Sequence, residues 1–523
     1  MKINEWVFQG IVFAILFTSV SIIVSLFSGL VWRSSIVVFV LSVLISVFIF
    51  RKFRIRREPH WTVYLLAVLG FILVAHPLLF IHPYFDSSAD SAPTIATAVI
   101  KDRLPQDYSP YSNLKYNYQP GLPLFARIFA DFFPGVPIHI ILWMIACIFS
   151  AFQVILIYLV GSKLFGSEKA GIWAALLFLG TKLVFQNVFV GEYTWSVATV
   201  FFLGTFLMFM ERNPLGYILY PAVFITHPGV ALYSIIFIGI FGIFSGRWKD
   251  WIKLMASAAV AAPAFFTYSS AAGNIGSSLS IEAGIRAYSA LPLFAGAIPV
   301  LLLVISVGWM ISKKISWKRE EKIAFGVLIA GIFLQGIFGV GVSPVMGVKI
   351  VEMIGIVVSL LAGSFLSRLE GRGLEVGLAA VILIGILAFF FTSSTLTEMR
   401  NGSKITPAEA AFALKFKEFD PGLKRVLIIS PAGGKIAQYA DKIPYNVRTN
   451  WFISSAGHIS GRDEAYQEEV RREENWNNIL NNRCVECMGG IDVDYIVVNR
   501  DVFPELNKTK VFEYKDFIVY DGK

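Results

Sequence analysis

The sequence predicts a polytopic α-helical membrane protein with a small α/β domain near its C-terminus, and three observations lead to this fold class. First, 56% of the 523 residues are hydrophobic and only 15% are charged, whereas soluble globular chains have roughly 25% charged residues. Second, long apolar runs recur along most of the chain. Third, near residue 396 the pattern changes to short β-branched runs and amphipathic segments.

The apolar runs predict about 13 transmembrane or re-entrant helices, because a spanning helix needs about 20 mostly apolar residues. The runs are 7–31, 34–50, 61–82, 138–160, 170–190, 194–210, 214–226, 229–245, 251–268, 290–311, 322–342, 346–366 and 373–395. The seventh and eighth are short and flank THPG (226–229), so we expect two half-helices that enter and leave from one side. Irregular backbone at that depth survives only against protein or a wet cavity. The first run lacks an early small-residue cleavage site, which favours a retained helix over a signal peptide.

The basic residues predict the orientation. They cluster in short loops, at 51–57, 246–253, 313–322 and 367–372, and such loops are cytoplasmic in membrane proteins. The N-terminus is then also cytoplasmic, whereas the long loop at 83–137 and the tail lie outside. The formal net charge of +9 is therefore a sign of membrane topology, and it does not indicate binding to nucleic acid.

We expect a transmembrane domain over 1–395 and an extracytoplasmic α/β domain over 396–523. Strands are predicted at 425–431, 493–499 and 515–522, with VLIIS and YIVVN as neighbours, and helices at 408–419 and 468–482. The sequons at Asn401 and Asn507 are compatible with the outer face. The CVEC motif predicts a disulfide or two free thiols at Cys484 and Cys487, or less readily a metal site, and Cys147 fits an inert core thiol.

The candidate chemistry begins in the long outer loop, where YFDSSADS places Asp86 and Asp90 just past an apolar run. A carboxylate beside an apolar wall has a raised pKa and can take a proton from a hydroxyl. The second acid could share that work or bind a divalent cation. The alternatives are that Asp90 caps the helix predicted at 92–104 and that Asp86 is a solvated acid. The Pro- and aromatic-rich loop is expected to fold against the helix ends and to wall a cavity.

Other polar residues converge on the same leaflet, although each has a structural alternative. An intramembrane charge indicates function by default, but a lysine can also snorkel to the surface. Glu192 could be a plain interfacial acid, Arg286 an exposed loop charge, and His227 a satisfied interior histidine. The lysine and glutamate near residue 350 could simply pair with each other. These candidates are Lys182, Glu192, His227, Arg286, Lys349 and Glu352.

The layout resembles the C-type integral-membrane glycosyltransferases, the GT-C superfamily. The resemblance is carried by the D-x-x-x-D of the first outer loop, by YNYQPGLPLFARI (116–128), by the THPG break, and by the tail with VDYIVV. Those enzymes commonly carry an Asp in the first outer loop and a Y-x-P-G or P-P-G step before the next helix. Two extra helices precede the usual first one in this chain.

The resemblance implies transfer of a sugar from a polyprenyl-phosphate donor to a hydroxyl of a glycan, lipid or protein at the outer face. It implies that Asp90, and next Asp86, is the catalytic base or a metal ligand. Lys182, Arg286 or Lys349 could stabilise the leaving phosphate, and Tyr116 and Tyr118 could stack on sugar rings.

Metal use stays open, because members often have a histidine shortly after that Asp, whereas Ala92 and Thr94 stand here. If a cation such as Mg or Mn is bound, the candidate ligands are Asp86, Asp90 and Glu192. The expected enzyme is an inverting hexosyl- or pentosyltransferase of the cell envelope.

Two rival functions are a lipid-linked polysaccharide polymerase or ligase and a secondary transporter. A polymerase or ligase leans more on basic residues in a large outer loop than on an early acid. A transporter usually places its site near the midplane, within internal repeats. This sequence has no evident repeat, and its acids lie at the outer edge.

Overall fold

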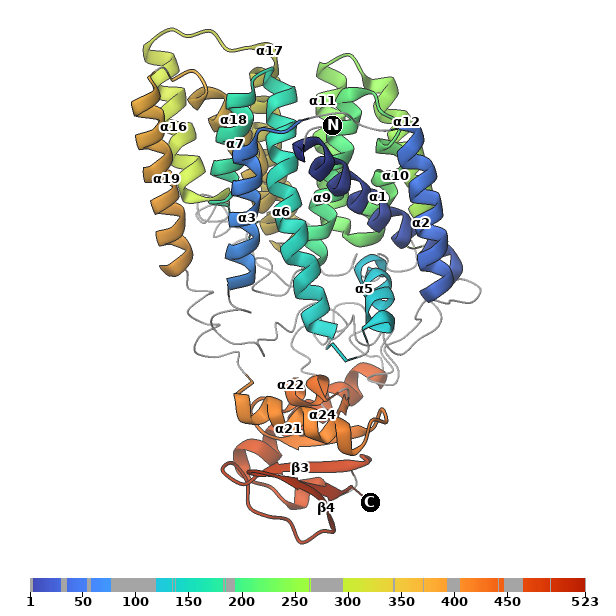
Figure 1. Cartoon of the computed structure of the whole chain (residues 1–523). Helices are drawn as coiled ribbons and strands as arrows, with labels where there is room; N and C mark the ends of the chain where they lie inside the picture. The colour runs from blue at the N-terminus through green and yellow to red at the C-terminus, as the bar shows by residue number, and fades with distance from the viewer. Residues whose placement is uncertain are drawn as a thin grey trace.

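In the computed structural model, a bundle of α-helices stands next to an α/β domain at one of its ends (Figure 1). The structure describes residues 3–29, 35–53, 58–76, 119–133, 135–136, 138–181, 184, 193–262, 264, 295–341, 344–369, 371–392, 405–440, 442–445, 464–489 and 491–522.

Except for α5, the helices of the bundle overlap the predicted apolar runs wherever the structure describes them. They are α1 (Ile3–Gly29), α2 (Ser35–Lys52), α3 (Trp61–His76), α5 (Gly121–Phe132), α6 (Ile138–Phe165), α7 (Glu168–Phe178), α9 (Tyr193–Glu211), α10 (Gly216–Thr226), α11 (Pro228–Phe244), α12 (Trp248–Ala258), η3 (Ala259–Ala261), α16 (Ala297–Ser312), α17 (Arg319–Gly341), α18 (Pro344–Leu366) and α19 (Arg372–Thr392). Among the described residues, α1, α2, α6, α9 and α19 are long and apolar enough to cross a membrane. The predicted fold class of a polytopic helical membrane protein is confirmed.

Helix α5 corrects the prediction of one loop over 83–137. Its twelve residues GLPLFARIFADF are too few to span a bilayer, and their mixed composition hid the helix from a search for apolar runs. The face that carries Leu122, Phe125 and Ile128 is buried against the bundle, whereas Asp131 at its far end pairs with Arg127 at 2.8 Å. The loop segment 83–118 lies outside the described residues.

Small residues allow the central helices α6, α7 and α18 to pack closely. A Cβ added at Gly171 would lie 2.0 Å from Ser162 Oγ, and one added at Gly363 would lie 2.5 Å from the backbone nitrogen of Ala174. Helix α7 therefore packs against both neighbours at a distance that larger side chains would prevent. Such contacts stabilise membrane helices, which gain little from the hydrophobic effect when they associate.

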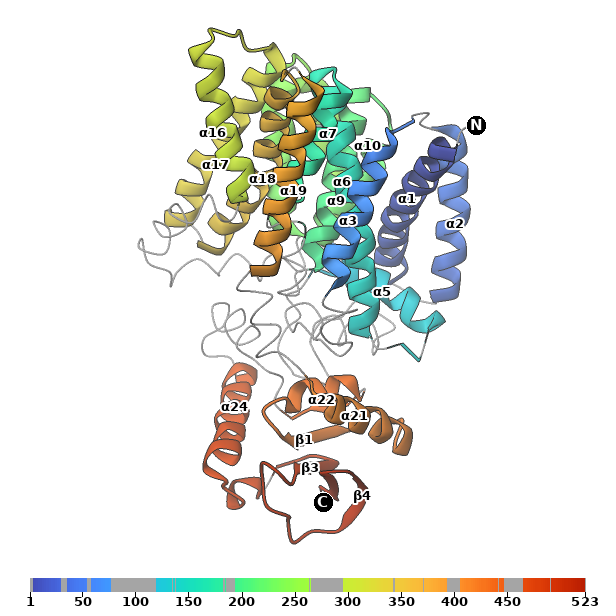
Figure 2. The same cartoon turned by 60° about the vertical axis from the view of Figure 1, so that its left-hand side comes forward.

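The described basic residues of the helix-connecting turns gather at the end of the bundle that lies opposite the α/β domain (Figures 1 and 2). We call it the basic end, and it carries Lys163, Lys169, Arg212, Arg247, Lys249, Lys313, Lys314, Lys318, Arg319 and Arg368. There the fully buried Glu321 accepts hydrogen bonds from Arg368 at 2.5 Å and from the Ser364 hydroxyl at 2.6 Å. This pair, in which only the carboxylate is fully buried, joins the start of α17 to the end of α18.

Helices α10, of 11 residues, and α11, of 17 residues, meet at His227, so the predicted break at THPG is confirmed, whereas the predicted re-entry of the two helices stays a prediction. The turn before α10 and the turn after α11 line one common cavity at the basic end, through Arg212, Asn213, Gly246 and Arg247. The start of α10 and the end of α11 therefore lie at the same end of the bundle.

The α/β domain contains the elements predicted for the tail and several that the sequence did not indicate. It consists of α21 (Pro407–Phe419), β1 (Arg425–Ile429), α22 (Gly433–Tyr439), β2 (Ile443–Pro444), α24 (Glu464–Asn482), η5 (Glu486–Met488), β3 (Tyr495–Asn499), β4 (Lys510–Tyr514) and β5 (Phe517–Asp521). The strand order is β2-β1-β3-β5-β4. Strands β1 and β3 pair in parallel, with Leu427 opposite Ile496, which confirms that VLIIS and YIVVN are neighbours.

Side chains of β1 alternate between the two faces of the sheet, as the period of two in a strand requires. Val426 and Ile428 pack with α21 and α22 on one face, whereas Leu427 and Ile429 pack with Trp476 of α24 on the other. The run is apolar throughout because both faces are covered. The predicted boundary between 395 and 396 lies outside the described residues and stays a prediction, as does the sequon at Asn401.

A partly buried polar cluster joins α21 to the sheet. Tyr495 donates a hydrogen bond of 2.8 Å to the carboxylate of Asp420, and the fully buried Lys442 donates to the carbonyl oxygens of Asp420 and Gly422. Burial opposes the charge on Asp420, but the bonds from Tyr495 and from the Gly422 amide, together with Lys442, lower its pKa. Burial and the same bond raise the pKa of Tyr495 to about 12.

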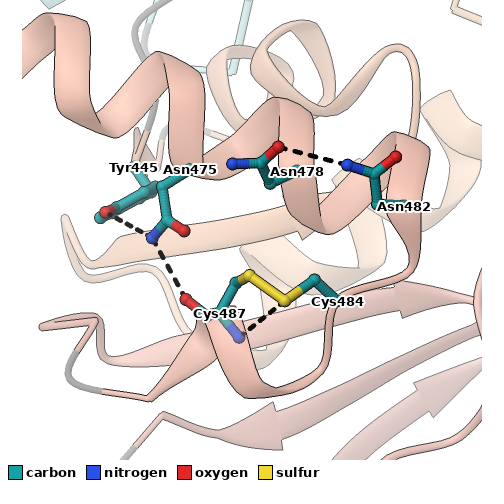
Figure 3. Close-up of a disulfide and its surroundings, with 6 residues drawn as sticks. All are labelled: Tyr445, Asn475, Asn478, Asn482, Cys484 and Cys487. Atoms are coloured by element: carbon teal, nitrogen blue, oxygen red, sulfur yellow. Dashed lines mark hydrogen bonds between the residues drawn. A yellow bond between two sulfur atoms is a disulfide. The ribbon is translucent and has the colours of Figure 1, made fainter.

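Cys484 and Cys487 form a disulfide just after α24 (Figure 3). The Asn475 side chain donates to the carbonyl oxygen of Cys487 at 3.2 Å and to the Tyr445 hydroxyl at 3.5 Å. Of the alternatives left by the CVEC motif, the structure thus has the disulfide. The predicted buried thiol at Cys147 is confirmed, and burial fits its inert role.

Candidate functional site

Most of the candidate site residues lie outside the described residues. These are Asp86, Asp90, Tyr116, Tyr118, Lys182, Glu192 and Arg286. Lys349 lies on the described backbone of α18, but its side chain is outside what the structure describes. His227 and Glu352 lie in the part of the chain that the structure describes. The roles assigned to all of these residues stay predictions.

His227 forms the break between α10 and α11. Its Nδ1 accepts hydrogen bonds from the backbone N–H groups of Gly229 at 3.1 Å and Val230 at 3.3 Å, so the ring caps the N-terminus of α11. Pro228 follows at the first helical position, where its lack of an N–H costs nothing. Because Nδ1 accepts, the proton of the neutral ring lies on Nε2, and this nitrogen is a donor.

The start of α5 packs directly against this break. Gln119 and Gly121 are buried, and a Cβ added at Gly121 would lie 2.8 Å from both the carbonyl oxygen of Ile225 and the Thr226 hydroxyl. Only glycine fits here. The Q-P-G step and the T-H-P-G step, which lie more than 100 positions apart in the sequence, therefore meet in one place.

An aromatic wall stands behind the break. The fully buried Trp195, in the first turn of α9, meets the His227 ring edge to face at 4.6 Å. Trp143 of α6 packs against Tyr193 at 6.1 Å and donates its indole N–H to the carbonyl oxygen of Val74 at 3.0 Å. These contacts link α3, α6 and the first turn of α9, and Trp195 joins that turn to His227. The sequence did not single out Gln119, Trp143 or Trp195 as candidates, and only the Y-x-P-G step gave a signal for Gln119.

Glu352 lies within α18 and is 1% exposed. A carboxylate at such a position is costly unless polar groups surround it. Helix α18 also contacts α11, the helix that His227 caps, and Met353 touches the Thr199 hydroxyl of α9 at 4.0 Å. The helix formed by the SPVMGVKIVEM run places Lys349 and Glu352 one turn apart, as predicted.

An apolar cavity of about 350 Å³ opens between α1, α5 and α6. Phe125 and Phe129 line it from successive turns of α5, starting one turn after Gly121, and Phe133 lines it just past the end of this helix. Met144 and Ile148 line it from α6. Met144 and Ile148 are also exposed, with 42% and 40% of their surfaces accessible, so the cavity opens on the outside of the bundle. Figure 1 shows α5 at the end of the bundle that faces the α/β domain.

Metal ligands do not cluster among the described residues, where no group of three or more His, Cys, Asp or Glu side chains could hold an ion. The acids proposed as ligands, Asp86, Asp90 and Glu192, fall outside the part of the chain that the structure describes. A divalent cation at this site therefore stays a prediction.

Comparisons with known proteins give a likeness in structure only. No family model matches the sequence, and no curated protein matches it. Among solved structures, the chain is similar to a cryo-EM structure of the arabinofuranosyltransferase AftD from mycobacteria, with 12% identity and a TM-score of 0.45. The match covers 88% of this chain and 41% of the AftD chain, so this chain spans less than half the length of AftD. A likeness of this size assigns neither activity nor substrate.

Proposed function

We propose that this chain is an integral-membrane glycosyltransferase of the GT-C type, which moves a sugar from a polyprenyl-phosphate donor to a hydroxyl of a glycan, lipid or protein. One observation carries the proposal. The apolar cavity beneath α5 starts one helical turn from the place where Gly121 meets the α10–α11 break. An apolar groove that leads to a polar helix break suits a donor with a long lipid tail and a charged phosphate.

The donor would lie with its polyprenyl tail along Phe125, Phe129 and Phe133 and its phosphate near His227. The Nε2–H of His227 is a hydrogen-bond donor, and a donor placed where charge develops stabilises the transition state. Lys182, Arg286 or Lys349 would add positive charge to the leaving phosphate. Tyr116 and Tyr118 would stack on the sugar, with Glu192 and Glu352 as further polar contacts.

The reaction would be an inverting displacement at the anomeric carbon. Asp90, or else Asp86, takes the proton of the acceptor hydroxyl, the acceptor oxygen bonds to the anomeric carbon, and the bond from that carbon to the phosphate oxygen breaks. The products are the glycosylated acceptor and the polyprenyl phosphate. A cation such as Mg or Mn, if bound by Asp86, Asp90 or Glu192, would screen the phosphate charge.

The proposed place of the reaction is the outer face of a cell membrane. The basic end would face the cytoplasm together with the N-terminus, because basic loops stay on that side. The cavity under α5 and the α/β domain would then lie on the outer side. The disulfide of the α/β domain supports this orientation, since disulfides persist in oxidising compartments.

The test is Asp90→Asn, with transfer from a synthetic polyprenyl-phosphate sugar measured in detergent. If Asp90 is the base, transfer falls by roughly 10²–10⁴-fold, the usual contribution of a general base, while donor binding is kept. Asparagine can still cap a helix, so a capping role alone predicts little loss. The matched variant is Asp86→Asn. Turnover near that of the wild type in both, and also in Glu192→Gln, would refute the glycosyltransferase proposal in this form.

A further inference from the structure

A second cavity, of about 500 Å³, lies at the basic end of the bundle, away from the proposed active site. The turn that joins α9 to α10 forms one side, with Arg212 and Asn213. The turn that joins α11 to α12 forms the other side, with Arg247 and Lys249. The proposed function uses none of these residues.

One of the three cations of this cavity is already neutralised. The guanidinium of Arg247 donates to Asp250 at 2.9 and 3.1 Å and stacks over the Phe209 ring at 4.3 Å. Arg247 thus holds the two turns together. Arg212 and Lys249 line the same cavity, and in the described part of the chain neither makes an ion pair with a carboxylate. Two positive charges are therefore available to an anion.

The surroundings of these charges are those of a lipid–water boundary. Trp248 and Tyr217, which also line the cavity, have 50% and 38% of their surfaces exposed, and exposed tryptophan and tyrosine mark the headgroup level of membrane proteins. Met208 and Leu254 supply an apolar wall on the side toward the bundle. A ligand of this cavity must therefore combine negative charge with apolar parts.

A small apolar void adjoins the cavity. It shares Met208 with the cavity and is lined further by Gly204 and Leu207 of α9, by Leu215 just before α10, by Leu219 of α10, and by α1. Its volume of about 30 Å³ is too small for an acyl chain. The apolar part of a ligand would therefore lie against the exposed side chains of Trp248 and Tyr217 at the rim of the cavity.

We propose that the cavity binds the headgroup of an anionic phospholipid, with the phosphate between Arg212 and Lys249 and the acyl chains in the bilayer beside Trp248 and Tyr217. Basic pockets between membrane helices on the cytoplasmic side are suited to such headgroups. The bound lipid would bridge the two ends of the helix pair α10–α11. It would thereby stabilise the helices that present His227.

The experiment titrates the purified protein in neutral detergent with phosphatidylglycerol or phosphatidylcholine and counts bound lipid by native mass spectrometry. The variants are Arg212→Asn, Lys249→Gln and the double variant. Asparagine suits residue 212 because the backbone there has a φ of 56°, which asparagine tolerates. The control is Lys253→Gln, an exposed lysine of α12 outside the cavity lining.

We expect phosphatidylglycerol to bind more tightly than phosphatidylcholine. Each single variant should weaken its binding by about fivefold and the double variant by about thirtyfold, because each basic group near the surface contributes about 1 kcal/mol. Lys253→Gln should bind like the wild type. The melting temperature of each variant without lipid shows whether it is folded. Added salt should weaken the binding of phosphatidylglycerol to the wild type, which tests the electrostatic contribution without any variant.

Three results would overturn the proposal. The double variant could keep wild-type affinity for phosphatidylglycerol, or Lys253→Gln could lose as much as the double variant does. The third contradicting result is that soluble glycerol phosphate binds the lipid-free protein and displaces phosphatidylglycerol at the same concentrations. The ligand of the cavity would then be a free phosphate compound and not a lipid.

Discussion

Gly121 is the residue at which the entry to the proposed site is most tightly packed. A Cβ there would lie 2.8 Å from the Ile225 carbonyl oxygen, so Gly121→Val must push α5 away from the helix break. Overpacking of this kind costs about 1–3 kcal/mol. We expect Gly121→Val to lower the melting temperature in detergent. We also expect the rate of sugar transfer to fall by a larger fraction than the fraction of folded protein does.

The matched control is Gly10→Ala on α1. No heavy atom lies within 4 Å of a Cβ built at Gly10, so alanine there should be neutral or stabilise the helix by about 0.5–1 kcal/mol. Equal melting temperatures for Gly121→Val and the wild type would contradict the packing at this position.

Tyr495 and Asp420 give the α/β domain a stability that depends on pH. The pKa of Tyr495 is raised to about 12 by burial and by its bond to Asp420. Because the pKa of Tyr495 is higher in the folded state, the folded state is stabilised fully at any pH below about 10, the pKa of an unfolded tyrosine. This stabilisation is lost as the pH rises from about 10 toward about 12. The lowered pKa of Asp420 contributes stability above about 4, and this is lost as the pH falls.

We therefore expect Tyr495→Phe to flatten the loss of stability at both alkaline and acid pH, because the hydroxyl no longer titrates and Asp420 loses a bond that lowers its pKa. The measurement is the rate at which proteases of alkaline and of acid optimum cleave the tail of the full-length protein. Tyr514→Phe on the edge strand removes a hydroxyl but not this bond. Identical pH profiles for Tyr495→Phe and Tyr514→Phe would contradict the assignment.

At the scale of elements, two variants of His227, at the break between α10 and α11, can separate its role as a helix cap from a chemical role. His227→Ala removes both the cap and the ring, and loss of a cap costs about 0.5–2 kcal/mol. His227→Asn keeps an oxygen that can cap α11 but lacks the Nε2–H. If this donor serves the phosphate, the Asn variant should melt like the wild type and transfer sugar at least tenfold more slowly, a loss of about 1.4 kcal/mol.

The same two variants also test the alternative, in which His227 caps α11 and has no chemical role. If His227 only caps the helix, transfer should follow melting temperature, so the Asn variant would be active and only the Ala variant impaired. Binding of the sugar donor, measured for the same variants, shows whether slower transfer comes from weaker binding of the phosphate or from a slower reaction of bound donor.

The sequence predicted elements best where one physical signal dominated. Long apolar runs identified the spanning helices, and THPG identified the break because proline and glycine interrupt a helix there. Helix α5 was missed because it is short and amphipathic. Strand β4 was missed because its pattern KVFEY mixes charged and apolar residues at the edge of the sheet.

The site was predictable only in its local parts. His227 stood out by its sequence neighbours, whereas the contact of Gly121 with Ile225 and Thr226 joins segments that are distant in the sequence. Trp195 and Trp143 are tryptophans in apolar helices, and no local pattern separates a tryptophan that faces His227 from one that faces lipid. Such contacts follow from helix packing, which periodicity does not specify.

At the scale of the whole molecule, the predicted orientation can be tested with cysteines at both ends. Lys314→Cys lies in a turn at the basic end, and Asp516→Cys lies in the exposed turn between β4 and β5. With a membrane-impermeant maleimide on intact cells, we expect labelling at position 516 only. Permeabilised cells should label at both positions, and labelling at 314 alone in intact cells would reverse the topology.

The place of β5 inside the sheet has a consequence for how the α/β domain is assembled. Strand β5 comes after β4 in the chain but lies between β3 and β4, and Phe517–Tyr520 is buried throughout. During synthesis, β3 must therefore wait with an unpaired edge, which can pair with foreign strands, until the β4–β5 hairpin docks on it. A nonsense change just before Phe517 would remove an interior strand and leave β4 without its partner. Such a chain would therefore be a substrate for degradation and not a slightly shortened, folded protein.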